Sequence, residues 1–421
     1  MKYSADLTFV KKYNYPERIK EHFREILSHI DESKVESVIL TGSTSRGELS
    51  YSTIDERFII YSDYEFLIVS KGKVDAKDVD RLEKAYRKLE DSFSDNLLFH
   101  IDFSYIDVKY LRSLPPHLKH YETRKNGVVV YGRDLLHLIP EITLETLDFK
   151  DLNEILIWRL WVMLLYFPKE IALAGKNDTE NQNVYKYVLC RNLLDLTTWI
   201  LPLKNVLLHS FKERYAYLKG NFGELQDSEV IDNRFLKLME ECMIGKFEMK
   251  FGRSLLDIYA DVTEYFLRAK ESLLNIHYMS KDDAAMIKYV VDTNSGKLFH
   301  DYHYKRKGFE TLIFLKNHKD MGVLRGIRWI LRGKYCLMLE FLSQIHIAML
   351  SNLSNDKERA SYCLDIASSI LQKLSVRNAF KLENREFGRS WQTLRRGFAN
   401  FLVEYFPSLG IKKDYINSVL D

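Results

Sequence analysis

Short apolar runs alternate with polar stretches over the first third of the chain. Residues 15–30 carry apolar side chains every three or four positions, which predicts an amphipathic helix. Residues 75–93 repeat that spacing with charged residues in between, which predicts a second, exposed helix. Four runs with the length of strands lie at residues 35–40, 64–69, 97–106 and 127–131. Helices and strands therefore share this region.

The strand pattern almost disappears after Pro140, and long stretches with helical spacing follow it. These stretches cover residues 152–167, 183–201, 255–276, 322–353 and 358–374. We therefore predict an α+β fold in which an amino-terminal domain at residues 1–145 precedes a mostly helical region. A polar, weakly periodic stretch at residues 293–307 divides that region into helical domains at 146–295 and 296–421.

The composition is that of an ordinary globular protein. A chain of 421 residues is long enough for two or three hydrophobic cores. Hydrophobic residues make up 46% and charged residues 29%, while only 18 Gly and 7 Pro are present. These values argue against disorder, collagen-like repeats and a turn-rich all-β protein. Since 13% of the residues are aromatic, aromatic side chains are expected to form much of the core.

Charge, cysteine usage and hydropathy limit the kinds of partner and the cellular compartment that we expect for this protein. A net charge of +3 does not mark the whole chain as a nucleic-acid binder. The cysteines are far apart in the sequence, at Cys190, Cys242, Cys336 and Cys363. This spacing argues against a zinc site or a disulfide framework and fits a reducing cytoplasm. The first residues lack the apolar core of a signal peptide, and no run reaches the ~20 apolar residues of a membrane span. We therefore expect a cytoplasmic protein with no membrane partner.

Polar residues at the ends of the predicted strands form one chemical pattern. Gly42 and Ser43 follow the first strand, Asp63 and Glu65 open the second, and Asp102 lies within the third. Because side chains alternate across a strand, the first two acids point to the same face. Carboxylates held this close repel one another unless a cation lies between them, and Mg²⁺ prefers such oxygen ligands. A third carboxylate on a neighbouring strand would complete a two-metal site, which activates a hydroxyl and stabilises a leaving pyrophosphate.

The Gly-Ser pair supplies what a triphosphate needs. Gly42 lets the backbone approach the phosphates closely. The hydroxyl of Ser43 and the amides that follow it can donate hydrogen bonds to phosphate oxygens. Each feature alone is common in proteins, so the hypothesis depends on their occurring together and in this order.

Together these residues resemble the catalytic pattern of the DNA-polymerase-β-like nucleotidyltransferase superfamily, over roughly residues 33–135. The resemblance implies a mixed-sheet catalytic domain in which Gly42 and Ser43 contact the nucleotide phosphates. It also implies that Asp63 and Glu65 bind two Mg²⁺ ions, with Mn²⁺ as an alternative. Asp102 would be the third carboxylate, acting as metal ligand and base towards the acceptor.

The sequence departs from the family pattern in two places. Asp63 follows Ser43 at a wider spacing than is usual in the family, and residues 51–61 between them are predicted to form a hairpin insertion. Glu65 stands where Asp is more common; its longer side chain still coordinates metal but could shift the metal position. Neither departure removes a group that the chemistry needs.

Other charged residues have weaker interpretations. Arg46 could reach a phosphate or be a surface arginine. Lys186 or Arg191 could hold the triphosphate, as a cation from the helical domain often does in this family, or lie at the surface along its apolar stem. Asp107 is more consistent with a helix N-cap than with the third carboxylate.

Basic residues also gather towards the carboxyl end. They are Lys305, Arg306, Lys307, Arg325, Arg328, Arg332, Lys334, Arg377, Lys381, Arg385, Arg389, Arg395 and Arg396. These helices could bind RNA or another polyanion. Because acidic residues are interspersed elsewhere and the net charge is small, a solvated helix face is the favoured interpretation.

The predicted activity is transfer of a nucleoside monophosphate from a nucleoside triphosphate, by default ATP, to an acceptor hydroxyl with release of pyrophosphate. A small molecule resembling an aminoglycoside, a protein side chain, an RNA end or a second nucleotide remain open as acceptors. The last would make the protein a cyclic-oligonucleotide second-messenger synthase. A different class of function is a catalytically silent nucleotide-binding or antitoxin-like partner module. Three clustered acids argue against it, because a binding module has no need of them.

Overall fold

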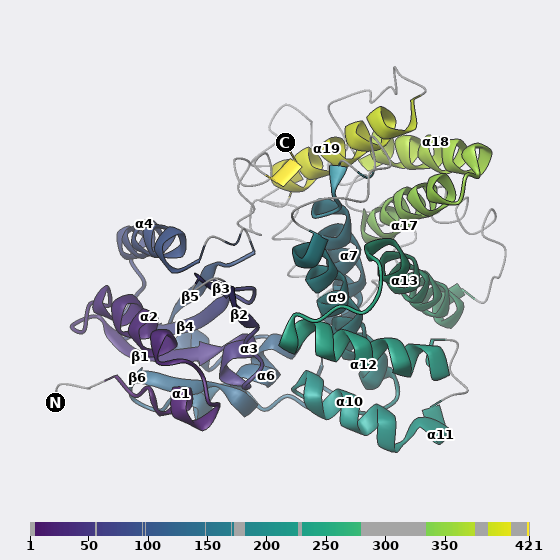
Figure 1. The fold of residues 1–421 in the computed structure, drawn as a ribbon. Coiled ribbons are helices and arrows are strands. Elements are labelled where there is room, and N and C mark those ends of the chain that lie inside the picture. The colour runs from purple at the N-terminus through teal and green to yellow at the C-terminus, as the bar shows by residue number, and fades with distance from the viewer. Residues whose placement is uncertain are drawn as a thin grey trace, which may run out of the picture. The chain divides into compact units, whose positions relative to one another are not determined.

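The computed structural model describes residues 5–54, 57–94, 96, 98–147, 149–169, 171, 182–225, 230–278, 334–374, 386–405 and 419–420. The chain divides into two compact units, each described by itself below (Figure 1). Unit 1 comprises Met1–Asp151, Ile200–Phe222 and Met239–Phe251, and unit 2 comprises Leu152–Trp199, Gly223–Leu238 and Gly252–Asp421.

A mixed four-stranded sheet forms the centre of unit 1. Its strands are β1 (Val35–Thr41), β4 (Tyr64–Ser70), β5 (Ile101–Asp107) and β6 (Val128–Gly132), in the order β5-β4-β1-β6. Strand β1 is antiparallel to both β4 and β6, whereas β4 and β5 are parallel. The parallel pair is joined through helix α4 (Ala76–Phe93), since parallel neighbours require a crossover connection. The α+β prediction is confirmed.

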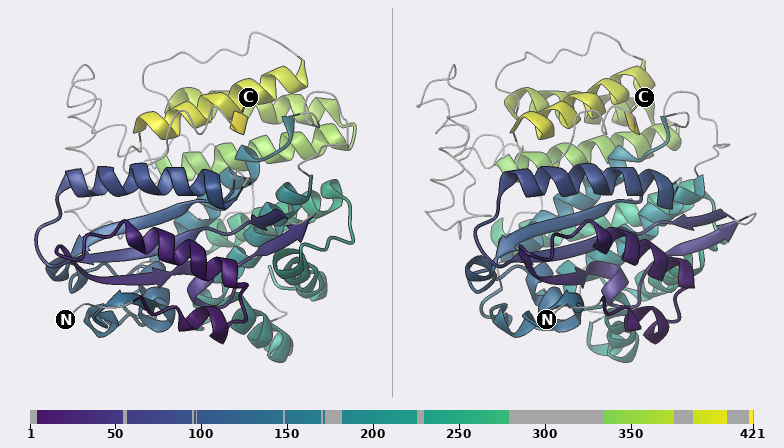
Figure 2. Two further views of the ribbon diagram at one scale, coloured as in Figure 1. Left: turned by 60° about the vertical axis from the view of Figure 1, so that its left-hand side comes forward. Right: turned by 90° about the vertical axis from the view of Figure 1, so that its left-hand side faces the viewer.

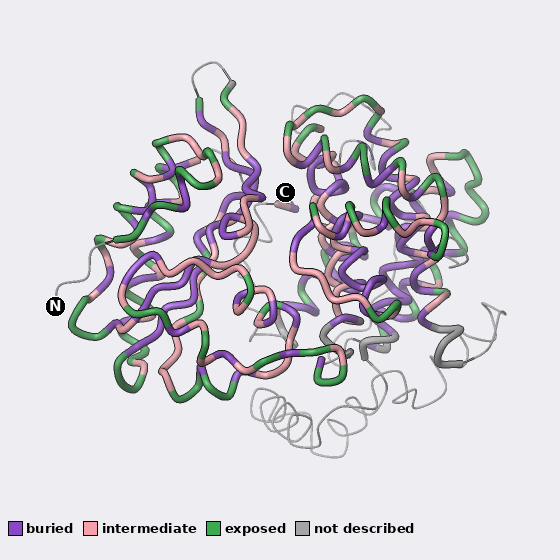
Figure 3. Tube along the Cα trace, turned by 90° about the horizontal axis from the view of Figure 1, so that it is seen from below, coloured by how far each residue is buried: buried purple, intermediate pink, exposed green. Residues whose placement is uncertain are grey.

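Both faces of the sheet are covered. Val38 and Phe66 belong to the core that includes α1 (Thr8–Lys12), α2 (Glu17–Ser28) and α4. Ile39 and Leu67, the next residues on the same strands, belong to a second core around α5 (Val108–Leu111) and η1 (Leu136–Leu138). Figure 2 shows α2 and α4, in purple and blue, running along the sheet. The two central strands, β1 and β4, are mostly buried along their length, and the burial of the chain can be followed in Figure 3. Near-continuous apolar runs therefore reflect a sheet buried on both sides.

The predicted insertion between Ser43 and Asp63 forms a hairpin. Strands β2 (Tyr51–Ile54) and β3 (Arg57–Ile60) pair antiparallel, with Tyr51 opposite Ile60. The extra residues therefore pair with one another and not with the four-stranded sheet.

Strand β5 begins at Ile101, later than the expected Leu97, which is itself outside the described residues. Asn96 is the physical reason. Its Nδ2 donates to the carbonyl of Ile60 at 2.9 Å, and its Oδ1 accepts from the amide of Leu98 at 3.1 Å. These bonds hold a turn where the apolar pattern alone suggests continued strand.

Two segments from beyond residue 145 belong to unit 1. They contain α10 (Phe211–Gly220) and the second half of α12 (Asn233–Glu248). The short helices α3 (Gly42–Ser45) and α6 (Leu118–Asn126) also belong to unit 1, whereas most of α11 (Phe222–Leu225) belongs to unit 2. The part of the chain that surrounds the sheet is therefore larger than the first 145 residues.

The described residues of unit 2 form helices and the turns between them. Its helices are α7 (Phe149–Leu165), α9 (Gln182–Leu203), α13 (Leu255–Tyr278), α17 (Lys334–Leu353), α18 (Lys357–Leu374) and α19 (Phe387–Tyr405). Aromatic side chains contribute to the core, as in the pair Trp161 and Phe398, whose ring centroids are 5.4 Å apart. None of the helices within the described ranges is both long and apolar enough to cross a membrane.

Several expectations fall outside the described residues. These are the division near residue 295 and the basic residues at 305–332 and 377–385. Among the basic residues that are described, Arg395 does not lie on a solvated face. It is only 2% exposed, its guanidinium stacks on Trp391 and it donates to the carbonyl of Leu165. Arg395 is therefore part of the core of unit 2.

Candidate active site

Gly42 and Glu65 meet where β1 ends. Thr41, the last residue of β1, pairs with Glu65, the second residue of β4. Gly42 has a φ of +67°, a conformation that costs other residues energy, and a Cβ added to it would stand 2.3 Å from Oε1 of Glu65. Glycine is therefore needed here both for the backbone turn and for the space occupied by the Glu65 carboxylate.

Asp102 is the neighbour of Glu65 on the other side of β4. The two residues are register partners on the parallel strands β4 and β5, so their side chains project from the same face of the sheet. Asp63 immediately precedes β4 and is two residues from Glu65, which also directs it to that face. All three acids lie at the edge where β1 ends and where β4 and β5 begin. The sequence hypothesis that these groups meet is consistent with this placement.

The three acids influence one another electrostatically. The pKa of Asp102 is raised to about 7, first because surrounding protein hinders hydration of its carboxylate, and then because Asp63 and Glu65 add negative charge. Asp102 still retains an exposed surface. Its raised pKa shows that the three carboxylates lie within electrostatic range of one another.

His100 is a nearby group that the sequence analysis did not single out. Burial lowers its pKa, but a hydrogen bond to Glu90 and the charge of Asp63 raise it more, so the pKa is above the ordinary value. Its backbone carbonyl accepts a hydrogen bond from the amide of Tyr64 at 2.9 Å. The available signal was its position two residues before Asp102, on the same predicted strand.

Metal binding by these residues stays a prediction. Over the described ranges, no group of three or more His, Cys, Asp and Glu side chains is arranged to hold a metal ion. The chemistry of the acids nevertheless suits Mg²⁺, which proteins commonly bind through one or two carboxylates while substrate phosphates supply other ligands. The negative charges of the neighbouring carboxylates raise the pKa of Asp102, and a bound cation would reduce the repulsion among these acids.

The segment after Gly42 is fixed by hydrogen bonds within unit 1. Ser45 donates to the carbonyl of Gly42 at 2.9 Å, and Thr44 donates to the carbonyl of Asp63 at 3.4 Å. The hydroxyl of Tyr15 donates to the carbonyl of Thr44 at 3.1 Å. Ser43 is the second residue of α3, next to Gly42. The Gly-Ser pair therefore lies in a well-anchored turn beside the acids.

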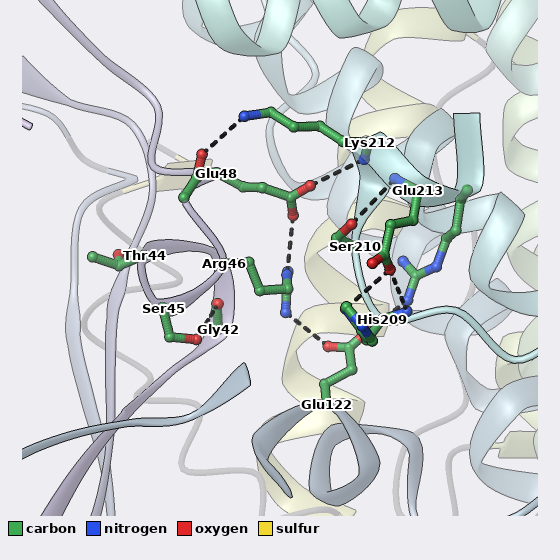
Figure 4. A network of polar contacts seen from close by, with 12 residues as sticks. Gly42, Thr44, Ser45, Arg46, Glu48, Glu122, His209, Ser210, Lys212 and Glu213 are labelled. Carbon is green, nitrogen blue, oxygen red and sulfur yellow. Dashed lines mark hydrogen bonds and ion pairs between the residues drawn. The ribbon is translucent and has the colours of Figure 1, made fainter. Parts of the chain in front are cut away.

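Arg46 is not a surface arginine. Its side chain is 8% exposed and pairs with Glu48 at 3.0 Å and with Glu122 at 2.9 Å (Figure 4). Burial lowers the pKa of Arg46, but the carboxylates of Glu122 and Glu48 raise it further, so the group stays charged. Its guanidinium is thus engaged by protein carboxylates, and contact with a phosphate stays a prediction.

The structure also shows the local environment of the other charged residues considered from the sequence. Asp107 accepts a hydrogen bond from the amide of Tyr110 at 2.7 Å, which confirms its prediction as the N-cap of α5. Lys186 and Arg191 lie on α9 within unit 2, where Arg191 is 4.0 Å from Asp195. Their proposed contact with a triphosphate stays a prediction.

Comparison with known proteins yields little similarity. No protein-family model matches the chain. None of the curated proteins searched matches it either. Among solved structures, the chain is similar to a spectinomycin adenyltransferase from Enterococcus faecialis determined with ATP and spectinomycin. The TM-score is 0.35 and the identity 12%, over 60% of this chain and 98% of the other. Likeness at this level assigns neither a family nor an activity.

Proposed function

We propose that the protein is a metal-dependent nucleotidyltransferase, which transfers a nucleoside monophosphate from a nucleoside triphosphate to an acceptor hydroxyl. The observation that carries the proposal is the meeting of Glu65 with Gly42 on one side and with Asp102 on the other. Gly42 contacts the Glu65 side chain so closely that no Cβ fits, and Asp102 is the register partner of Glu65. The turn that we propose to bind phosphate therefore adjoins an acidic pair at one edge of the sheet.

Each group has a distinct role in the proposed reaction. The acceptor oxygen forms a bond to the α-phosphorus, and the bond from that phosphorus to the pyrophosphate oxygen breaks. The acceptor proton passes to the carboxylate of Asp102. The turn at Gly42 and Ser43 orients the triphosphate, and such positioning supplies much of the catalysis of phosphoryl-type transfers.

Asp63 and Glu65 would hold Mg²⁺, with Asp102 as the third ligand. The ion would neutralise charge on the triphosphate and on the departing pyrophosphate. Without a cation, the acids repel a polyanionic substrate, so activity is expected to require added divalent metal. ATP is the donor to test first.

Incubation with Mg²⁺ and each α-radiolabelled nucleoside triphosphate tests the proposal, with cell extract as a source of acceptor. Label is expected to enter protein or a new small product with the intact enzyme. The Asp63→Ala, Glu65→Ala variant is expected to lose this transfer, whereas Asp80→Ala, an exposed carboxylate on α4, is expected to retain it. Absence of transfer with every nucleotide, with and without extract, would sink the proposal.

A further inference from the structure

Charged side chains that the proposed reaction does not use are buried beside the turn at Gly42. The side chains of Arg46 and Glu48 are 8% and 0% exposed, and Ser50 is buried as well. Buried charges are costly unless they are paired and hydrogen-bonded with good geometry. These side chains lie next to the candidate active site, and the segments that they bind indicate their role.

Glu48 joins the turn to two distant parts of unit 1. Its Oε2 accepts from Nε of Arg46 at 3.0 Å, and its Oε1 accepts from the backbone amide of Lys212 at 3.1 Å. Its backbone carbonyl accepts from Nζ of Lys246 at 3.2 Å. Lys246 is 1% exposed and also donates to Oγ of Ser50 at 3.0 Å. Helices α10 and α12 therefore both donate hydrogen bonds to the segment of residues 48–50.

Glu122 on α6 provides a second link. Its Oε2 accepts from Nη1 of Arg46 at 2.9 Å, and its Oε1 accepts from Nη2 of Arg214 at 2.5 Å. Arg214 in turn donates through Nε to the carbonyl of Leu208 at 3.1 Å. Figure 4 shows Glu122 facing Arg46, with Glu48 on the other side of the guanidinium. The carboxylate of Glu122 is thus bound by two arginines that are far apart in the sequence.

Arg46 transmits this restraint to the Gly-Ser pair. It directly follows α3, and its amide donates to the carbonyl of Ser43 at 3.2 Å. The amide of Glu48 donates to that same carbonyl at 2.9 Å. A movement of Arg46 or Glu48 would therefore move Ser43 directly.

Stability alone does not require such an arrangement, because well-packed apolar side chains often replace buried ion pairs at no loss. Arg46 instead makes one charge-assisted hydrogen bond to each of two carboxylates, and such bonds add directional geometry that apolar contacts lack. We propose that Glu48 and Glu122 are positioning residues that act through Arg46 and hold the Gly42–Ser43 backbone ready for the nucleotide phosphates. This inference rests on the nucleotidyl transfer proposed above.

Glu122→Gln tests it, because this change removes the charge and keeps the shape. The matched control is Arg133→Gln, which removes a pair with Glu36 of similar length, 2.8 Å, whose arginine is exposed. Hydrogen exchange of peptides spanning residues 42–50 is measured in each full-length protein, together with kcat and KM for the nucleoside triphosphate. Arg214→Lys, which keeps the positive charge, serves as the conservative variant if Glu122→Gln fails to fold.

Glu122→Gln is expected to raise exchange of this segment and the nucleotide KM each by about tenfold, with kcat changed by less than about threefold. Arg214→Lys should lie between the intact protein and Glu122→Gln, and Arg133→Gln should match the intact protein. Unchanged exchange in a folded variant overturns the inference, and so does faster exchange with an unchanged KM. If the intact protein transfers no nucleotide, the proposed function fails, and exchange alone then decides whether these residues hold the turn.

Discussion

Gly42 lies directly against the carboxylate of Glu65, so that a Cβ on Gly42 would stand 2.3 Å from Oε1 and 2.6 Å from Cδ. Gly42→Ala is therefore expected to displace the Glu65 side chain as well as to strain a backbone with φ of +67°. The free energy of unfolding should fall by about 1–3 kcal/mol. Nucleotide transfer should fall further, by about 100-fold or more, because a small displacement of a reacting group is costly.

Gly72→Ala is the matched control, because a Cβ there meets nothing within 4 Å and its φ is ordinary. Urea unfolding and the transfer assay on the two variants separate strain from a general effect of replacing glycine. Equal transfer by both variants would show that contact between Gly42 and Glu65 is unimportant for the reaction.

Stability below neutral pH is expected to depend on His22. This residue is 5% exposed, lies 3.1 Å from the hydroxyl of Tyr64 through Nδ1 and stacks on Phe93. Burial, and to a lesser extent the charge of Arg18, lowers its pKa from 6.5 to about 4. Between these values the unfolded chain binds the proton more strongly, so stability falls as the pH falls from about 6.5 to 4.

The loss attributable to His22 over that range is about 2–3 kcal/mol. His22→Gln removes the titration, so the free energy of unfolding of the variant should decline less between pH 7 and pH 4.5. His120 and His346 also have lowered pKa values, but they are present in both proteins and cancel in the comparison. Parallel pH curves for the two proteins would contradict the assignment to His22.

The core of unit 2 contains a buried ion pair whose loss is expected to be costly. Nζ of Lys270 is 2.9 Å from Oε2 of Glu340, and Gln344 donates to the other carboxylate oxygen at 2.7 Å. Lys270→Met leaves a buried negative charge and should cost about 3–5 kcal/mol. Adding Glu340→Gln should recover at least about 1 kcal/mol, as measured by a double-mutant cycle. Additive losses would show that the two side chains are not coupled.

Local patterns in the sequence predicted most of the elements of unit 1. Alternation and run length predicted strands β1, β4 and β6, and the apolar residues near Phe58 predicted the hairpin. The predicted start of β5 was wrong because the side chain of Asn96 accepts a hydrogen bond from the amide of Leu98. The periodicity of apolar residues carries no information on such a bond. Strand order was not predictable from these patterns, since pairing depends on contacts between distant segments.

The candidate site, too, was predictable where it depends on local pattern and not where it depends on contacts between distant segments. The acids were recognisable because Asp63 and Glu65 are two residues apart on one strand, which alternation alone places on one face. The pairing of Glu65 with Asp102 depends on the register of two strands separated by α4. The burial of Arg46 was missed because Glu122 is far along the chain and no local pattern links them.

The most direct test of the central claim compares nucleotide transfer by Asp102→Asn and Asp107→Asn. Both changes replace an aspartate by its amide at opposite ends of β5, and asparagine preserves the N-cap that Asp107 forms with Tyr110. We predict that Asp102→Asn lowers kcat by at least about 100-fold, since a general base contributes that much or more. Asp107→Asn should retain the activity of the intact protein. Equal transfer by the two variants would contradict the assignment of Asp102, with Asp63 and Glu65, as the catalytic centre.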